Sequence, residues 1–388
     1  MSDRWNKSNK SKSSYYGIKN IEEFKRLINE NKTSGKDWYY GLKDRWWWGM
    51  SEEIAIRHVE DYFLPDTKFD GIVLISTWNI NCGIATYTKY LLEELSKISQ
   101  NSFVINPINR GILSQRINGR LTHLQHEYGI LPTIPAIKSK VIITWHTVLK
   151  DIHNTIKAFE SEYDVVAHIV HSERARDSMK SSRDILVVPH GSMLIPEMKK
   201  EDARRLLGMN VDMPVGFVFG FQSGDKNYNR LISAAKHTGI HLMISGAPHD
   251  LVRSISIANS RNVTFINRYL TESEVSLYAL ASDVLLFDYV GKDHYSVSGA
   301  MHRIIGAGRP VVCSDIKHFK DIEDDKHCLK FKDQEELEKC IVCAIKDSGQ
   351  LSLAAREYAE MTSWPNVARR HVEIYKKYSN VSSLKLIK

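Results

Sequence analysis

The chain has 388 residues, which is more than one ordinary core holds, so two or more domains are expected. A hydrophobic fraction of 43%, a charged fraction of 26% and a moderate net charge of +7 are typical of a globular protein. Apolar runs stay well below the ~20 residues that a membrane helix needs, which argues against a transmembrane segment. Five scattered cysteines and a start that lacks the apolar core of a signal peptide favour the cytoplasm.

The first 66 residues are predicted to form an N-terminal extension. Residues 1–14 are rich in Ser, Lys and Asn and predict a disordered tail, and residues 20–31 have the apolar periodicity of a helix. Between this helix and a second helical pattern lies an aromatic stretch that includes Trp46, Trp47 and Trp48. These rings either pack against the rest of the chain or another subunit, which makes an oligomer possible, or form a platform for an acceptor.

From residue 67 onward, short apolar runs typical of strands alternate with helical patterns, in one series up to residue 208 and a second from 209 to 362. Such alternation predicts parallel sheets with helices on both faces. The fold class is therefore α/β, with two Rossmann-like doubly wound domains facing across a cleft. Ligands of such sheets bind beyond the carboxyl ends of the strands, so residues that follow each strand are the candidates for function.

In the first series, Gly83 follows a predicted strand and precedes a helix, where exposed backbone N–H groups suit an anion or a sugar. His126, His146 and His190 each follow another predicted strand, which indicates a polar cleft. The paired histidines along these strands, such as His123 with His126, would face opposite sides of the sheet. We therefore expect no metal site and no cofactor.

In the second series, the predicted strand 215–220 is followed by Gln222 and Lys226 ahead of a helix, an arrangement that suits phosphate although it is not a Walker loop. After another predicted strand, a polar loop that begins at Asp288 runs through Ser296, Ser298 and Gly299 into a helix. A serine can cap this helix, and its exposed N–H groups would favour a bound diphosphate.

Several short motifs, in this order, resemble the family-4-like retaining glycosyltransferases of the GT-B fold. The resemblance extends from about residue 71 to 378, and one subgroup is especially close. The matching motifs are CGIA (82–85), QHEYG (125–129), HTVL (146–149), VPHG (188–191), FINRYL (265–270), SG (298–299), GRPVV (308–312) and SW (363–364).

The resemblance implies transfer of a sugar from a nucleotide-diphosphate sugar, with a UDP-sugar favoured, to an acceptor hydroxyl with retention of anomeric configuration. It implies that Gly83 contacts the donor or acceptor, that His126 approaches the transferred sugar, and that Lys226 neutralises the leaving phosphates. It further implies that Ser298 and Gly299 bind the diphosphate and that the backbone near Arg268 meets the nucleobase. Residues 363–388 would form a helix that crosses back to the first domain.

Two departures from the family pattern leave the other donor contacts open. Gln222 stands where many relatives have an arginine, and Tyr295 and Arg303 stand where many have a Glu-x7-Glu pair. Asp288 is one candidate for the missing contacts, and His146 and His190 are candidates for acceptor binding. The acceptor itself is open among a glycan, a lipid-linked molecule and a polynucleotide. The alternatives are a transferase that modifies bases in DNA, as some phage enzymes do, and a non-catalytic subunit that binds a sugar nucleotide.

Overall fold

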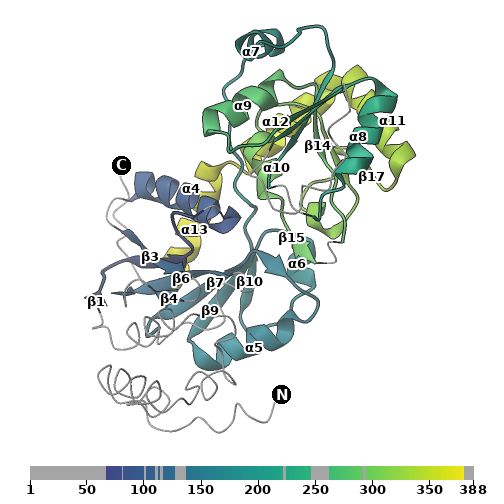
Figure 1. Ribbon diagram of the computed structural model, residues 1–388. Helices are drawn as coiled ribbons and strands as arrows, with labels where there is room; N and C mark the ends of the chain where they lie inside the picture. The colour runs from purple at the N-terminus through teal and green to yellow at the C-terminus, as the bar shows by residue number, and fades with distance from the viewer. Residues whose placement is uncertain are drawn as a thin grey trace, which may run out of the picture.

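The computed structural model describes residues 67–80, 82–99, 102–109, 112–113, 117–126, 137–221, 224–245, 262–291 and 294–379. They form two α/β domains, one above the other in Figure 1, with the last helix of the chain returning to the first domain. The predicted extension, including Trp46, Trp47 and Trp48, lies outside the described residues, as does Gln222. Among the described helices, none combines the length and apolar character needed to span a bilayer.

The first domain is built on a seven-stranded sheet whose strand pairs are parallel except for the antiparallel edge pair β3–β4. In spatial order the strands are β10 (Asp184–Val187), β9 (Val165–Val170), β7 (Lys140–Trp145), β6 (Leu121–His126), β2 (Ile72–Ser76), β3 (Phe103–Asn109) and β4 (Ile112–Leu113). A separate short pair joins β1 (Thr67–Lys68) to β5 (Ile117–Asn118).

Successive side chains along each strand point to opposite faces of this sheet, and different helices cover the two faces. In β2, Ile72 and Leu74 pack with α4 (Gly83–Ile98) and α13 (Trp364–Ser379), the last helix of the chain. Val73 and Ile75 pack on the opposite face with α5 (Ile152–Glu162). Every residue of β2 is therefore buried, as expected for a parallel strand covered on both faces. The short α6 (Glu173–Asp177) follows β9 at the edge of the sheet.

The second domain has a six-stranded sheet in which all pairs are parallel, in agreement with the sequence pattern. In spatial order its strands are β13 (Val263–Ile266), β12 (His241–Ser245), β11 (Val215–Phe219), β14 (Val284–Phe287), β16 (Val311–Ser314) and β17 (Leu329–Phe331). One face packs on α8 (Tyr228–Thr238) and α11 (Gln334–Lys346), and the other on α7 (Lys200–Leu206), α9 (Glu272–Ala281), α10 (Gly299–Ile304) and α12 (Ser348–Met361). A 3-10 turn, Lys317–Phe319, follows β16.

Two segments of chain cross between the domains side by side. The backbone N–H of Ser192 donates to the carbonyl of Thr362 at 2.8 Å, and the Ser192 hydroxyl lies 2.7 Å from His302 Nδ1 of α10. A second link is the antiparallel pair of β8 (Thr147–Val148), from the first domain, with β15 (Tyr295–Ser296), from the second. The loop that leads into α10 is therefore attached to both domains.

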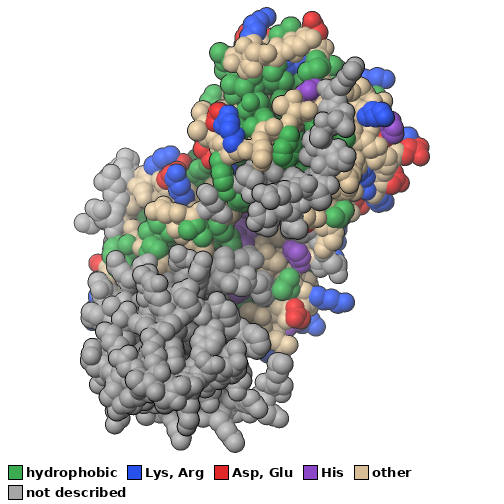
Figure 2. Space-filling view, in the orientation of Figure 1, with side chains coloured by type: hydrophobic (Ala, Val, Ile, Leu, Met, Phe, Trp, Pro, Cys, Tyr) green, Lys and Arg blue, Asp and Glu red, His purple; other side chains and the backbone are tan. Residues whose placement is uncertain are grey.

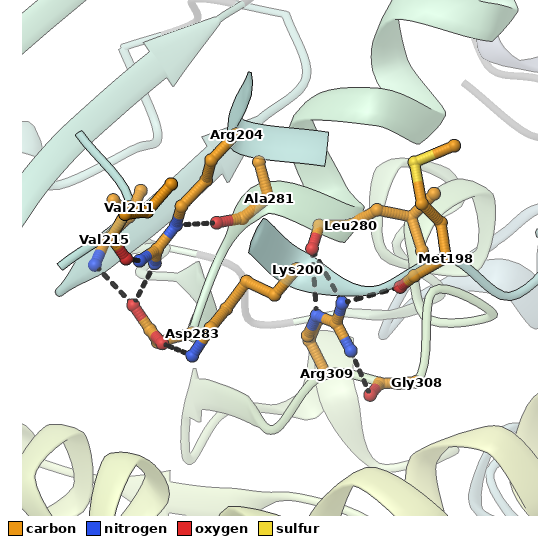
Figure 3. Close-up of polar contacts among 10 residues, drawn as sticks. All are labelled: Met198, Lys200, Arg204, Val211, Val215, Leu280, Ala281, Asp283, Gly308 and Arg309. Atoms are coloured by element: carbon orange, nitrogen blue, oxygen red, sulfur yellow. Dashed lines mark hydrogen bonds and ion pairs between the residues drawn. The ribbon is translucent and has the colours of Figure 1, made fainter. Parts of the chain in front are cut away.

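A buried arginine fastens α7 to the second domain (Figure 3). Arg204 is 2% exposed, and its guanidinium donates to the carbonyls of Ala281 (2.8 Å) and Val211 (2.5 Å) and to the carboxylate of Asp283 (2.6 Å). The same carboxylate accepts from the backbone N–H of Val215 at 2.6 Å, where β11 begins. Since α7 packs against α9, the second domain begins before residue 209, earlier than the sequence pattern suggested.

Candidate functional site

A cavity of about 290 Å³ lies between the two domains, where the carboxyl ends of their strands meet. The first domain contributes the start of α4, with Gly83 and Tyr87, and the second contributes residues that follow β11 and β14 and the start of α10. Figure 2 shows histidine side chains at the surface where the two domains meet. The location agrees with the expectation that function follows the strand ends of both sheets.

Lys226 and the start of α10 lie in one wall of this cavity, as the sequence led us to expect. Ser298 caps α10 by accepting a hydrogen bond from Met301 N at 3.3 Å, and Gly299 is the first residue of the helix. The Lys226 ammonium donates to the carbonyl of Phe221 and lies 5.4 Å from the centre of the Tyr289 ring. It is 8% exposed, so the positive charge lies at the border of the cavity rather than in open solvent.

Gly220 makes room for this lysine. Its φ of +122° is one that side chains rarely adopt, and a Cβ at this position would lie 2.8 Å from Lys226 Nζ and 2.9 Å from the Cβ of Ala300. A glycine here therefore allows the ammonium to approach the first turn of α10. The two features that suit an anion, a cation and the exposed N–H groups of a helix start, occupy the same corner.

Four buried polar atoms of the cavity lining have no protein hydrogen-bond partner within the described parts of the chain. They are Tyr87 Oη, Ser245 Oγ, Arg303 Nε and Trp364 Nε1. A buried polar group left unsatisfied costs about 1–3 kcal/mol, and native structures contain few of them. Each atom belongs to a side chain that lines the cavity, although the atom itself is enclosed by protein.

His126 does not extend into the cavity. It is the last residue of β6, and its ring lies against Trp145 (4.3 Å between ring centres) and Phe159 (5.4 Å) on the face covered by α5. Burial lowers its pKa to about 3, so the ring is neutral at physiological pH. Alternation along β6 turns this side chain into the core, and an approach of His126 to the transferred sugar through its backbone carbonyl stays a prediction.

Replacing His126 by phenylalanine should flatten the pH dependence of stability. The folded-state pKa of about 3 lies below the unfolded value of roughly 6.5. The contribution of His126 to the free energy of unfolding is therefore full above pH ~6.5 and is lost as the pH falls toward 3. Between about pH 4 and 6 the unfolded chain binds one proton more at this site. We expect the slope of unfolding free energy against pH to fall by about 1.4 kcal/mol per pH unit in His126→Phe. Urea titrations at several pH values measure it, and equal slopes in the two proteins would contradict the assignment.

His146 belongs to a chain of hydrogen bonds behind the cavity. Its Nε2 lies 2.9 Å from Gln125 Oε1, and its Nδ1 lies 3.2 Å from Nε2 of His171, whose Nδ1 donates to the carbonyl of Val188 at 2.9 Å. Burial, followed by the nearby His171, lowers the pKa of His146 well below its usual value. His190 does line the cavity, and the two predicted acceptor histidines therefore have different surroundings.

Three of the residues that were predicted to bind the sugar donor are not among the described residues that line the cavity. Asp288 is 1% exposed and forms a two-point ion pair with Arg230 of α8, at 2.5 and 2.6 Å. Ser296 on β15 bonds to His318 Nδ1 at 2.6 Å, and Arg268 forms an exposed ion pair with Glu274 at 2.6 Å. Asp288 therefore ties α8 to the end of β14, rather than offering a carboxylate to a ligand.

The structure adds lining residues that were not predicted. Ser245 ends β12, so the rule that function follows strand ends could have identified it. Tyr87, one turn into α4, and Trp364, at the start of α13, lie in or next to two of the matching motifs, but the sequence did not place them at the site. They meet through ring packing, with 5.0 Å between their centres, although they are far apart in the sequence.

Two facing doubly wound sheets, linked by two crossing segments and with the last helix returning to the first domain, define the GT-B fold, as the motifs predicted. No family model matches the chain, and neither does any curated protein sequence. Solved structures do match. A sucrose-phosphate synthase from Thermosynechococcus elongatus is 16% identical, with a TM-score of 0.60 over 81% of this chain and 100% of that one. Anabaena HepE in complex with UDP and glucose is 11% identical, with a TM-score of 0.62 over 80% of this chain and 100% of that one. A glycosyltransferase from Rickettsia africae is 13% identical, with a TM-score of 0.59 over 81% and 100%.

Proposed function

We propose that this chain is a glycosyltransferase that moves a sugar from a nucleotide-diphosphate sugar to an acceptor hydroxyl. One observation carries the proposal: the cavity between the sheets brings Lys226 together with Gly220 and the start of α10. Glycosyltransferases share the fold, and one of the matching structures holds UDP and glucose. A UDP-sugar is therefore the first donor to test.

In the proposed reaction, the bond between the anomeric carbon and the diphosphate breaks, and negative charge develops on the leaving phosphate. Preorganised donors lower the barrier when they face that charge. Lys226 and the backbone N–H groups of Ser298 and Gly299 supply them. Lys226 would exchange its bond to the Phe221 carbonyl for one to the phosphate. The reaction would need no divalent metal and would retain the anomeric configuration, with the acceptor hydroxyl arriving on the face that the diphosphate leaves.

A donor screen tests this function. The purified full-length chain is incubated with UDP-, GDP- and ADP-glucose, and the release of nucleoside diphosphate is measured with and without candidate acceptors, in EDTA and in Mg²⁺. We expect release from the UDP-sugar in both buffers. Binding of UDP by calorimetry, without release from any donor or acceptor, would instead support a non-catalytic subunit. Turnover only with duplex DNA that carries modified bases would support the DNA-modifying alternative.

The anomeric outcome needs a separate measurement. The product of an active donor–acceptor pair is examined by proton NMR, in which the coupling constant of the anomeric proton distinguishes α- from β-linkage. With the α-linked UDP-glucose as donor, an α-linked product is expected. A β-linked product would contradict retention while leaving glycosyl transfer itself established.

A further inference from the structure

His190 occupies a fixed position in the wall of the cavity. It is 9% exposed, and its ring is surrounded by those of Tyr87 (5.1 Å between centres), His302 (4.7 Å) and Trp364 (5.7 Å). The next residue must be a glycine, because a Cβ on Gly191 would overlap the Trp364 indole. The ring therefore has one orientation, set by residues of both domains and of the last helix.

The hydrogen bond of this ring determines which nitrogen carries the proton. Nδ1 of His190 lies 2.9 Å from the carbonyl oxygen of Gly191, and a carbonyl can only accept, so Nδ1 carries the hydrogen. In the neutral ring, Nε2 then has the lone pair. It faces Gly299, since a Cβ on that glycine would lie 3.5 Å from Nε2. A proton acceptor therefore lies beside the start of α10, where the leaving diphosphate is proposed to bind.

The ring is kept neutral by its surroundings. Burial is the main cause that lowers the pKa of His190 well below its usual value, and the nearby His302, His171 and His146 lower it further. The bond to Gly191 works in the opposite direction and does not outweigh them. Two lone pairs cannot face each other favourably, so neutral Nε2 and a phosphate oxygen need a proton between them. A hydroxyl group provides one.

Building on the proposed function, we propose that His190 is a catalytic residue that relays the proton of the acceptor hydroxyl. As the acceptor oxygen bonds to the anomeric carbon, its proton passes to Nε2 of His190, and the bond from that carbon to the diphosphate oxygen breaks. The imidazolium then returns the proton to the diphosphate, and the ring is neutral again. Because Nε2 is on the side of Gly299, the hydroxyl arrives on the face that the leaving group departs from, which agrees with retention.

Chemical rescue tests this role. In His190→Ala, release of UDP from UDP-glucose, with water as the acceptor, should fall by about 100-fold. Added imidazole, which fits the space vacated by the side chain, should raise the rate of UDP release by this variant at least about tenfold. UDP affinity by calorimetry should change less than about threefold, because the substitution leaves Lys226 and Ser298 in place. The control is His171→Ala, which removes a neighbouring imidazole outside the described lining and should gain nothing from imidazole.

The outcomes separate this proposal from the function on which it rests. If wild-type protein releases UDP and His190→Ala does so within about threefold of the same rate, the relay is wrong and glycosyl transfer stands. A parallel loss of rate and of UDP affinity, without rescue, would make His190 a binding residue and would also overturn the relay. Absence of release by the wild-type protein from any donor would overturn both. His190→Gln, which keeps a polar group of similar size, checks that a loss does not come from misfolding.

Discussion

Arg204→Ala is expected to destabilise the second domain by about 3–5 kcal/mol, as happens when one partner of a buried ion pair is removed. The variant strips the Asp283 carboxylate of its buried guanidinium and leaves two carbonyls without their donor. Lys200 still reaches Asp283 and keeps the loss from being larger. Hydrogen exchange of the β11 amides measures the effect in the domain concerned, because their opening free energy should fall by that amount.

The neighbouring arginine provides a matched control for that experiment. Arg205 lies next in α7, its side chain is 66% exposed, and it pairs with Asp202 one turn earlier. Exposed pairs of this kind contribute less than about 1 kcal/mol. Losses of equal size in Arg204→Ala and Arg205→Ala would mean that the buried network in Figure 3 does not hold α7 to the sheet.

Lys226→Ala is expected to cost about 2–4 kcal/mol of transition-state stabilisation, which is roughly a 30- to 1000-fold loss in kcat/KM for sugar transfer. The ammonium lies at the corner shared with Gly220 and the start of α10, where charge on a leaving phosphate would develop. Most of the loss should fall on kcat, because the interaction strengthens as the bond breaks. Steady-state rates with the donor identified by the screen provide the measurement.

A lysine on the surface of the same domain separates this effect from a general loss of charge. Lys236 is exposed in the last turn of α8 and is not among the residues that line the cavity. Lys236→Ala should transfer sugar at the wild-type rate. If Lys226→Ala did the same, the phosphate role of Lys226 would be wrong, while the cavity could still serve another ligand.

Local patterns were sufficient to predict the sheets and one wall of the cavity. Apolar runs such as 72–76 and 215–219 form buried parallel strands, and the serine-glycine pair at 298–299 starts a helix. These features depend on residues close together in the chain, where strand and cap preferences act. Lys226 was identifiable for the same reason, since it lies between a strand and the helix that follows.

The remaining parts of the site depend on contacts that the sequence does not display. A histidine at the end of a strand can turn toward the ligand or toward the core, and for His126 the packing of Trp145 decides the direction. Asp288 follows a strand, as a ligand-binding carboxylate would, but its side chain pairs with Arg230 of α8, which the sequence does not reveal. Trp364 reaches the cavity only because the last helix returns to the first domain. Each outcome is set by tertiary partners far apart in the chain.

The return of α13 to the first domain has a consequence for how the protein is made. Trp364, Val372 and Tyr375 belong to the core of the first domain, and the Tyr375 hydroxyl lies 2.6 Å from Nδ1 of the buried His123. On a ribosome, the first sheet and α4 emerge long before these residues, so the part of the face that α13 covers stays exposed until α13 follows. The described core of the second domain lies between residues 195 and 359. All of its core residues are therefore synthesised before α13, which completes the core of the first domain. Assembly during translation would therefore run against the usual order, with the N-terminal domain the last to become complete.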